Sequence, residues 1–459
     1  MFRRSALIFT LLAVFLGAAF LCSGRVETPA IPANLAKAQD FLSAAESMGG
    51  LPWWSPMFLQ GTSLAFAWSS MTANIVILVF SVPMGFLVGS KMAVLVLIAV
   101  GTVGSYSFLR TYTNDPISAA IGATLFLISP SLLTRASAPD HFAVVCSMSL
   151  LPWAFFGVLH FLRSPSVVTA IAASLAYAAV VLAYGKTGVM ALPAVGLFAL
   201  VELMRLPRNN RPSLRLFVIA GAAFSLLAVV PNLPALRETG FVAMFQFGPF
   251  EGWQHGFSTK SALGWIDRDG ILTSGISPSY APTTAGGGTY LGLAVFSCLT
   301  IALFLGTFHS SDLGRKARSF LIFGLLMFWF SFGPKSVLGG QFEFLSLSLG
   351  APDFSPALSW FLVVAQVWMI FRLIPTSCVF RPAIGAAISA VYLIVPGFRL
   401  IEWLPIYRNI RAPFDFFQVT GVLCVLFAAA IVIRLLLGSI PRPVLRSSLA
   451  AALLALTIL

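Results

Sequence analysis

The sequence predicts an all-α fold, a polytopic membrane helix bundle of about 12–13 transmembrane helices with a juxtamembrane helix and large outer loops. Charged residues make up 9% of the chain and hydrophobic residues 58%, against roughly 25% and 45–50% in soluble domains. Apolar stretches recur from Ser5 to Leu459, and about 20 such residues suffice for one helical crossing of a bilayer. The connectors between these stretches also alternate in charge, which is typical of a multi-pass membrane protein.

The apolar stretches predict thirteen spans. They are residues 5–22, 90–109, 116–132, 143–162, 167–184, 188–204, 214–232, 289–307, 319–333, 357–374, 383–398, 418–437 and 447–459. Arg3 and Arg4 precede a first stretch that is long for a signal peptide and lacks a small-x-small cleavage site, which favours an uncleaved anchor. The chain stops inside its last apolar stretch, so we expect a missing carboxy-terminal part.

Residues 71–88 are apolar as well, but counting them as a crossing would invert every later connector. It would place the arginine-rich connectors RLPRNNRPSLR and GRKAR on the outer side. We therefore predict a juxtamembrane or re-entrant helix, bent near Pro83 and Gly85, because irregular backbone at membrane depth is tolerated only where protein or a cavity surrounds it.

With the amino terminus inside, the inner connectors hold sixteen basic and three acidic residues, and the outer side holds twelve of each. Such enrichment marks the cytoplasmic side, which predicts a multi-pass protein of an inner (plasma) membrane with a cytoplasmic amino terminus. A nucleic-acid partner is not expected, because it needs basic residues gathered on one soluble face. The five cysteines stand singly in apolar sequence, which predicts buried thiols.

The whole chain, residues 1–459, is expected to form a single domain with its polar chemistry on the periplasmic or extracellular face. Long loops in compact proteins are usually functional or disordered. The large or charged outer loops are residues 23–70, 133–142, 233–288, 334–356 and 399–417.

The first outer loop carries Asp40 and Glu46 on a predicted amphipathic helix, residues 34–48, just before the Trp53-Trp54 pair. A carboxylate held there could act as a general base. The alternative is that both acids are solvated helix charges and that the tryptophans belong to an interfacial aromatic belt.

The second outer connector concentrates Arg135, Asp140 and His141 within seven residues. Ionisable groups held against a bilayer are costly, so their presence indicates a functional site. The alternative is a solvent-facing hairpin in which Arg135 pairs with Asp140.

A late outer segment, residues 403–417, carries Arg408 and Arg411 against the positive-inside preference. Guanidinium groups suit bidentate recognition of phosphate, which predicts contact with a lipid phosphate. The alternatives are lipid headgroups in general, or pairing with Glu402 and Asp415.

The Asp267-Arg268-Asp269 triplet lacks the further ligands of a calcium loop, so we interpret it as structural.

This layout resembles the GT-C superfamily of integral-membrane glycosyltransferases. LPWWSPMFLQGTSLAF looks like the G-x-L-P-x-W-x-P-x-x-x-x-G stretch of YfhO-like bacterial membrane proteins and of those labelled 6-pyruvoyl-tetrahydropterin-synthase-related, a label that implies no pterin chemistry. SPSLLTRASAPDHFAVV resembles the P-x-x-x-x-R…D second loop of oligosaccharyltransferase catalytic subunits, and LPIYRNIRAPFDFF is similar to the late R-x-P segment of the YfhO-like group.

The resemblance implies transfer of a sugar from a polyprenyl-phosphate or polyprenyl-diphosphate donor to a glycan, lipid or protein acceptor. The family base aligns near Ala30, where this chain has no acid, so either Glu27 or Asp40 substitutes through a shifted loop or the activity has been lost. Asp140 carries over to the second-loop acid, assisted by His141, and could hold Mg or Mn, although no cofactor is certain. The arginines expected on the lipid phosphate are Arg135, Arg408 and Arg411.

Three other functions compete with this hypothesis. A transporter of lipid-linked saccharide would need ionisable residues and broken helices at mid-membrane depth, and the predicted spans are almost free of charge. A polysaccharide polymerase or ligase would use the large 233–288 loop. A non-catalytic relative would present an acceptor or serve as a scaffold. Membrane lipids are partners under each hypothesis.

Overall fold

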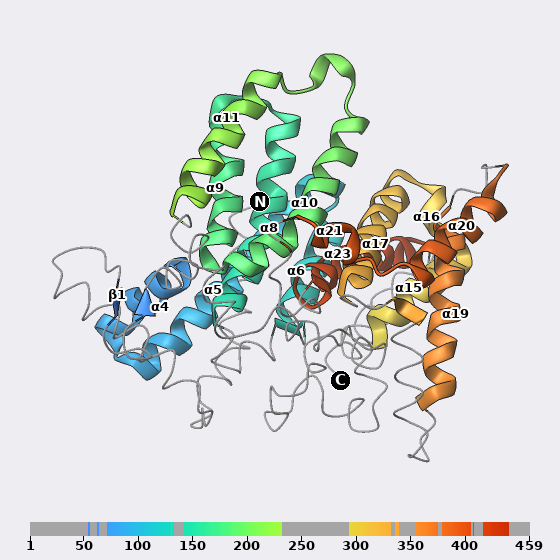
Figure 1. Ribbon diagram of the computed structural model, residues 1–459, viewed down its shortest axis with the longest axis horizontal. Coiled ribbons are helices and arrows are strands. Elements are labelled where there is room, and N and C mark those ends of the chain that lie inside the picture. Colours follow the sequence, from blue (N-terminus) through green and yellow to red (C-terminus); the bar gives the residue numbers. More distant parts are fainter. Residues whose placement is uncertain are drawn as a thin grey trace. The chain divides into compact units, whose positions relative to one another are not determined.

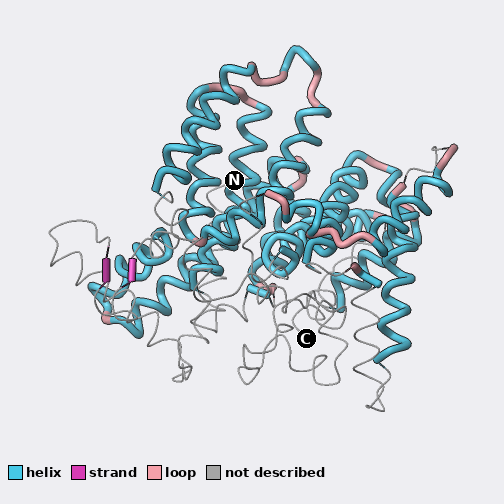
Figure 2. The backbone as a smooth tube through the Cα atoms, in the orientation of Figure 1, coloured by secondary structure: helices cyan, strands magenta, loops and turns pink. Residues whose placement is uncertain are grey.

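The computed structural model of this chain describes residues 54–55, 62–63, 71–129, 131–132, 142–231, 293–331, 336–338, 355–374, 379–404, 407 and 416–439. These residues are almost entirely helical (Figures 1 and 2). The exceptions are loops and two short strands, β1 (Trp54–Ser55) and β2 (Thr62–Ser63), which pair antiparallel. The chain splits into two compact units, Met1–Tyr112 with Arg135–Gly248 and Thr113–Thr134 with Pro249–Leu459.

The first unit contains six α-helices among its described residues. They are α4 (Met71–Met84), α5 (Phe86–Thr113), α8 (Phe142–Arg163), α9 (Val167–Ala183), α10 (Gly185–Arg205) and α11 (Leu214–Phe224). A short 3-10 turn, η2 (Arg208–Asn210), follows α10, and a π-helical turn, η3 (Ser225–Val229), continues α11. Ser166 and Thr169 form a capping box at the start of α9, which satisfies amide groups that a helix start leaves unpaired.

Helices α5 and α8 run parallel in this unit. The Trp153 indole donates to the Val100 carbonyl at 2.9 Å, and the Arg163 guanidinium donates to the Thr111 carbonyl at 2.6 Å. Helix α9 folds back antiparallel on α8, where the Ser147 hydroxyl donates to a carbonyl near the end of α9.

The core of the first unit is aromatic. Phe108, Tyr112, Phe155 and Phe198 are buried and pack ring against ring, with centroid distances of 5.3–5.7 Å. They come from three helices, α5, α8 and α10, whose carboxyl ends lie together. Burial of each such side chain contributes about 1.5–3 kcal/mol in water, and packing of this kind also holds helices together in lipid.

The second unit is arranged around one long buried helix. Its described elements are α6 (Pro116–Leu127), α15 (Leu293–Leu305), α16 (Thr307–Ser310), α17 (Asp312–Ser331), α19 (Ser355–Leu373), α20 (Arg381–Ile394), α21 (Arg399–Glu402), η6 (Phe416–Gly421) and α23 (Val422–Gly438). The π-helical turn η6 runs straight into α23, and nearly every residue from Phe416 to Ile433 is buried.

Neighbouring helices in the second unit alternate in direction. The Phe320 ring meets Phe427 at 5.5 Å and the Phe328 ring meets Phe417 at 5.0 Å, so α17 runs antiparallel to η6 and α23. Helix α20 returns against α19, where the Tyr392 hydroxyl donates to the Gln366 side chain at 3.0 Å. The Trp329 indole donates to the Val395 carbonyl at 2.9 Å, which brings the ends of α17 and α20 together.

The structure confirms a helical protein with helices fit for a membrane. Four described helices are long and apolar enough to cross a bilayer, Val88–Thr113, Phe142–Arg163, Gly185–Arg205 and Phe416–Gly438, and shorter apolar helices coincide with other predicted spans. The predicted spans 5–22 and 447–459 lie outside the described residues.

Several boundaries differ from those predicted, for identifiable reasons. Helix α17 begins at Asp312, well before the apolar window, because its charged first turns are helical and the Ser311 hydroxyl accepts the Gly314 amide at 2.9 Å. Helix α20 ends at Ile394 instead of 398, since Pro396 lacks an amide hydrogen and disfavours helical backbone in the residue before it.

The segment predicted to be a bent juxtamembrane helix is helical but broken rather than bent. Helix α4 ends at Met84 and α5 begins at Phe86. Gly85 between them has a φ of 74°, a left-handed conformation that favours glycine. Within the first unit α4 also contacts α8 and α9.

Candidate functional site

Four buried polar residues gather where α6 ends and the π-helical turn η6 begins. Ser129, Ser131, Gln418 and Thr420 are each at most 3% exposed, and we call them the α6–η6 polar cluster. The Ser131 hydroxyl donates to the Gln418 backbone carbonyl at 2.8 Å. The hydroxyls of Ser129 and Thr420 have no hydrogen-bond partner among the described residues. Buried polar groups are normally paired, so these two hydroxyls are available to a water or a ligand.

The antiparallel run of α6 and α23 explains why these residues meet. Asp115 at the start of α6 pairs with Arg434 near the end of α23, and Ser131 pairs with Gln418. Ser131 lies 16 residues after Asp115 in the chain, and Gln418 lies 16 residues before Arg434. Equal spacing places Ser129 at about the level of Thr420.

The π-helical turn η6 forms the aromatic side of the cluster. Phe416 packs against Phe330, Phe398 and Tyr407, and Phe417 packs against Phe328. Short π-helical turns inside longer helices are frequent at functional sites, because they reorient side chains at a small cost in packing. Burial raises the pKa of Tyr407 to about 12, so its hydroxyl stays protonated at neutral pH.

All the site residues predicted from the sequence lie outside the described residues. This holds for the proposed acids and their helper, Glu27, Asp40, Asp140 and His141, and for the proposed phosphate ligands, Arg135, Arg408 and Arg411. The structure does bring together the edges of two of the segments that carry them. Ser131 lies two residues before the second outer connector, and Gln418 follows directly after the late outer segment.

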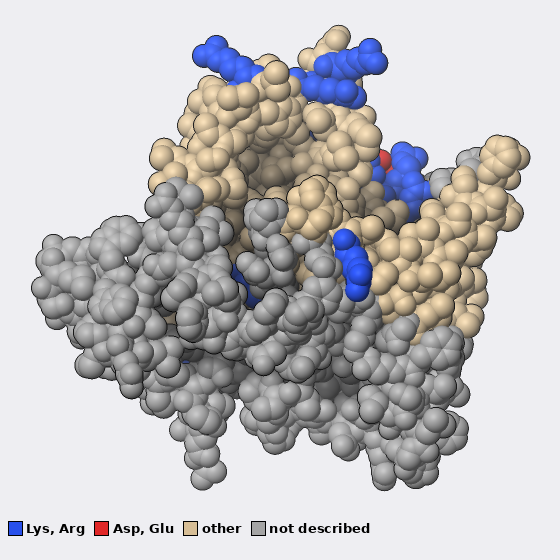
Figure 3. Space-filling model, in the orientation of Figure 1, with Lys and Arg blue, Asp and Glu red and all other residues tan. Residues whose placement is uncertain are grey.

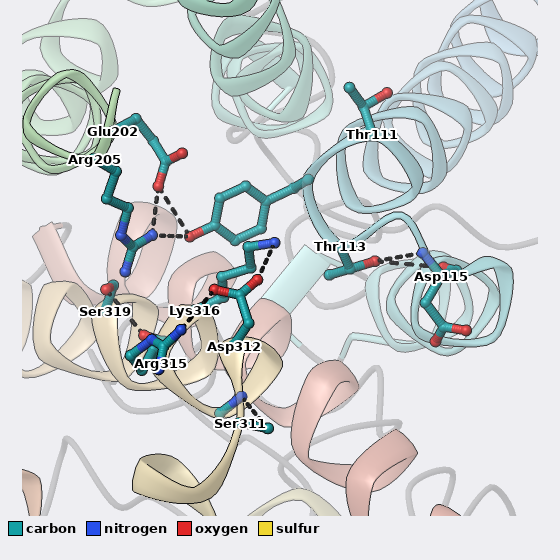
Figure 4. Close-up of polar contacts among 12 residues, drawn as sticks. Thr111, Thr113, Asp115, Glu202, Arg205, Ser311, Asp312, Arg315, Lys316 and Ser319 are labelled. Carbon is teal, nitrogen blue, oxygen red and sulfur yellow. Dashed lines mark hydrogen bonds and ion pairs between the residues drawn. The ribbon is translucent and has the colours of Figure 1, made fainter. Parts of the chain in front are cut away.

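A second group of polar residues lies at the carboxyl ends of α5 and α10. Glu202 and Arg205 point toward each other in Figure 4 and form an ion pair. The Tyr112 hydroxyl donates to Glu202 at 3.3 Å and accepts from Arg205 at 3.0 Å. Tyr112 and Glu202 are buried, whereas the Arg205 side chain is 34% exposed. The three groups hydrogen-bond one another, which is typical of a structural lock between two helices.

Asp115 caps the start of α6 in the second unit. One carboxylate oxygen accepts the Ser118 amide at 2.8 Å and its hydroxyl at 2.7 Å, and the same oxygen lies 3.2 Å from Nε of Arg434. Burial would raise the pKa of Asp115, but these hydrogen bonds and the arginine outweigh it and hold the pKa below its usual value. The carboxylate is therefore a structural charge at neutral pH.

Charged residues also gather at the start of α17. Asp312 pairs with Lys316 at 2.7 Å and with Arg315 at 3.4 Å (Figure 4). The hydrogen bond from Lys316 lowers the pKa of Asp312, and the two cations outweigh its partial burial.

His309 accepts from Arg318 through Nδ1 at 3.0 Å, because a guanidinium only donates. Its Nε2 then carries the proton and donates to the Arg372 carbonyl at 2.8 Å.

Several arginines at these helix ends cap neighbouring helices. Arg163 donates to the Thr111 and Tyr112 carbonyls at the end of α5. Arg372 donates to the Leu303 and Phe304 carbonyls at the end of α15. Cations at helix carboxyl ends satisfy unpaired carbonyls and complement the helix dipole, so part of the basic charge predicted on the inner side holds the fold together.

Metal binding stays a prediction. Among the described residues no three His, Cys, Asp or Glu side chains are grouped closely enough to hold an ion, and Asp140 lies outside them. The buried cysteines Cys146, Cys298 and Cys424 are unpaired thiols, as their scattered positions predicted.

Comparison with protein families and with curated proteins gives no match. No protein-family model matches the chain, and no curated protein is significantly similar to it. The functional assignment therefore depends on the residues themselves.

Sequence reasoning missed the α6–η6 polar cluster and the Tyr112 triad. The i, i+3 spacing of Glu202 and Arg205 at a helix end is a signal from which their pairing could have been predicted. Nothing in the sequence indicated Tyr112, which lies 90 positions before Glu202. The hydroxyls of Ser129 and Thr420 gave no signal, because single Ser and Thr residues are common in apolar helices.

Proposed function

We propose that the protein is a GT-C-like glycosyltransferase that moves a sugar from a polyprenyl-phosphate or polyprenyl-diphosphate carrier to an acceptor at the outer face of a bacterial inner membrane. The observation that carries this proposal is the 2.8 Å hydrogen bond between Ser131 and the Gln418 carbonyl. It holds together the ends of two predicted spans, at residues that precede the second outer connector and follow the late outer segment in the chain. The arginines proposed to bind the lipid phosphate belong to those two segments.

Chain connectivity supports a shared role for these arginines. Arg135 follows Ser131 by four positions, and Arg411 precedes Gln418 by seven. An extended chain advances at most about 3.6 Å per residue, so these segments reach at most about 14 Å and about 25 Å from the buried hydrogen bond. Guanidinium groups from both segments can then serve one lipid phosphate, with Arg408 as a third.

The proposed chemistry is a single displacement with inversion. Glu27 or Asp40 takes the proton of the acceptor hydroxyl as general base, and the acceptor oxygen bonds to the anomeric carbon while the bond from that carbon to the phosphate oxygen breaks. The phosphate leaves with the bonding electron pair, and arginines offset its charge. Asp140 and His141 orient the acceptor, or Asp140 helps to hold Mg or Mn, which would add a further positive charge.

The charges at the helix ends support the proposed membrane sidedness. The capping arginines and the ion pairs of Glu202, Asp115 and Asp312 lie at the helix ends that the sequence predicts on the inner side. The opposite ends, where Ser131 and Gln418 meet, carry few described charges. We propose that the charged ends face the cytoplasm, in keeping with the positive-inside rule, and that the α6–η6 polar cluster faces the outer side.

The described helix interiors favour an enzyme over a transporter of lipid-linked saccharide. Transporters place ionisable side chains and helix breaks near the bilayer midplane. In the candidate spans Phe142–Arg163 and Phe416–Gly438 the basic residues lie toward the carboxyl ends. The polymerase or ligase alternative predicts that an assay detects a polysaccharide product. The non-catalytic alternative predicts that it detects no transfer.

Donor turnover by the purified full-length chain in lipid vesicles tests the proposal. Polyprenyl-phosphate and polyprenyl-diphosphate sugars with a labelled sugar are supplied together with membrane extract as the acceptor source, and label transfer is measured. Loss of a general base lowers rates by about 10²–10⁴-fold, so Glu27→Ala or Asp40→Ala should abolish most transfer, and Asp140→Ala should slow it. Thr420→Val, which removes one buried hydroxyl at constant shape, tests the α6–η6 polar cluster directly and should slow transfer.

The matched control is Asp312→Ala, which removes an acid at the opposite helix ends and should leave the rate within about twofold. If no substitution at the three proposed acids slows transfer, the site assignment is wrong. If every donor stays intact while the carrier lipid still binds, the chain is a non-catalytic relative.

A further inference from the structure

The connector between α10 and α11 presents three exposed arginines. Arg208 lies in the 3-10 turn η2, Arg211 follows that turn, and Arg215 lies in the first turn of α11. All three are exposed, and we call them the hairpin-tip arginines. Lys and Arg side chains stand out at this end of the α10–α11 hairpin in Figure 3.

No acidic group in the described part of the first unit compensates this charge. Glu202 is the sole acidic residue there, and it is buried and paired with Arg205. Nε of Arg211 donates to the Leu206 carbonyl within the same connector at 3.2 Å. Arg208 and Arg215 form no ion pair with any described residue. They thus differ from Arg163 and Arg372, whose guanidinium groups cap neighbouring helices.

Exposed apolar residues follow these arginines in the chain on α11 and precede them on α10. On α11, Leu214 is 79% exposed and Val218 62%, and no residue of that helix is buried. On α10, Met204 is 61% exposed and Leu200 49%. Exposed apolar helix faces of this kind mark contact with a membrane or another protein. The positive charge of the hairpin-tip arginines beside these residues decides between a membrane and a protein partner.

We propose that the hairpin-tip arginines bind the phosphate of an anionic phospholipid, with the acyl chains lying along the exposed residues of α10 and α11. Guanidinium groups bind phosphate oxygens in pairs, and basic residues at the end of an apolar helix match the order of headgroup and acyl chain in a leaflet. An acidic protein partner would satisfy the arginines but would leave Leu214 and Val218 exposed. The proposal rests on membrane placement and not on sugar transfer.

Native mass spectrometry of the purified full-length protein in detergent tests this proposal. Dioleoyl phosphatidylglycerol and dioleoyl phosphatidylcholine are titrated separately, and the bound lipid is counted. Each basic residue near an anionic lipid strengthens binding by about fivefold. The triple variant R208Q/R211Q/R215Q should therefore bind phosphatidylglycerol at least about tenfold more weakly, with phosphatidylcholine binding unchanged.

Two controls separate charge from position. The triple variant R208K/R211K/R215K keeps the charge but loses the paired guanidinium hydrogen bonds, so its phosphatidylglycerol binding should lie between that of the wild type and that of the glutamine variant. The single substitution Arg208→Gln is compared with Arg399→Gln, which removes an exposed arginine of the second unit. Arg208→Gln should weaken phosphatidylglycerol binding and Arg399→Gln should not.

Three results would overturn the proposal. In the first, the glutamine triple variant binds phosphatidylglycerol as tightly as the wild type does. In the second, the wild type binds phosphatidylcholine as well as it binds phosphatidylglycerol. In the third, soluble glycerol phosphate displaces the lipid at equal concentration, which would mean that the arginines bind a free phosphate ester and not a lipid. Sugar transfer is not measured in this experiment, so failure of the proposed enzymatic function leaves its outcome unaffected.

Discussion

Nε of Arg434 lies 3.2 Å from Oδ2 of Asp115, and this ion pair joins the end of the most buried helix in the second unit to the amino-terminal cap of α6. The preceding residue, Asn114, has a φ of 56°. Asparagine adopts this left-handed conformation more readily than most residues, and it ends α5 directly before the cap. One short connector thus ends a helix, starts another and fixes the register of α6 against α23.

Removal of the Asp115 side chain is predicted to destabilise the second unit. Asp115→Ala removes the acceptor for the Ser118 amide and leaves the partly buried Arg434 without its anion. Loss of an amino-terminal cap costs about 0.5–2 kcal/mol. Chemical unfolding of the purified protein in detergent should show this loss. Asp115→Asn keeps a cap acceptor and should lose less, and an Asn variant as unstable as the Ala variant would show that the cap is not the main contribution.

The same carboxylate predicts a pH dependence. The folded-state pKa of Asp115 lies below its usual value, so its contribution is complete above the unfolded pKa of about 3.9. It is lost as the pH falls through the folded pKa. The stability difference between wild type and Asp115→Asn should therefore stay constant from about pH 7 to pH 5 and shrink below about pH 4. A difference that grows on acidification would contradict this sign.

The Tyr112 hydroxyl is predicted to contribute little compared with its ring. Tyr112→Phe removes two hydrogen bonds but leaves the direct pair of Glu202 and Arg205, so we expect a cost of about 1 kcal/mol. Tyr112→Ala also empties the aromatic core and should cost about 3–5 kcal/mol. Thermal unfolding of both variants measures the difference. Equal losses would mean that the hydroxyl, and not the packing, holds α5 against α10.

Close approach of α5 and α8 is predicted to exclude any side chain at Gly104. An added Cβ would lie 2.6 Å from the Trp153 Nε1 atom, which donates to the Val100 carbonyl. Gly104→Ala must therefore displace the indole, at a cost of about 1–3 kcal/mol. The control Gly196→Ala meets nothing within 4 Å and should be neutral or stabilising by up to about 1 kcal/mol. A tolerated Gly104→Ala would show that α5 and α8 can separate freely.

Helix positions could be predicted from the sequence, whereas helix contacts could not. The bounds predicted from apolar stretches agree with those of α8 and α9 within one residue. Hydropathy and membrane thickness determine the length of the apolar stretch and of the helix alike. The same windows missed the start of α17, since its first residues are charged yet helical. The partners of Ser131 and Tyr112 depend on which helices pack together, and a single sequence does not encode that as a local pattern.

The motif residues of the candidate site were found through composition and a family resemblance, and their roles stay predictions. The α6–η6 polar cluster came from the structure alone, because its two unpaired hydroxyls are visible only after α6 and η6 are packed together. The two kinds of observation meet at Ser131 and Gln418, which are described residues directly bordering the predicted motifs.

The central claim is that the second outer connector and the late outer segment emerge on one side of the membrane and the hairpin-tip arginines on the other. Single cysteines placed at Ser137, Asn409 and Asn209 in a chain with its five cysteines replaced test it by labelling with a membrane-impermeant maleimide. Ser137 and Asn409 should react in intact cells, and Asn209 only after permeabilisation. Labelling of Asn209 in intact cells together with protection of Ser137 would contradict the account.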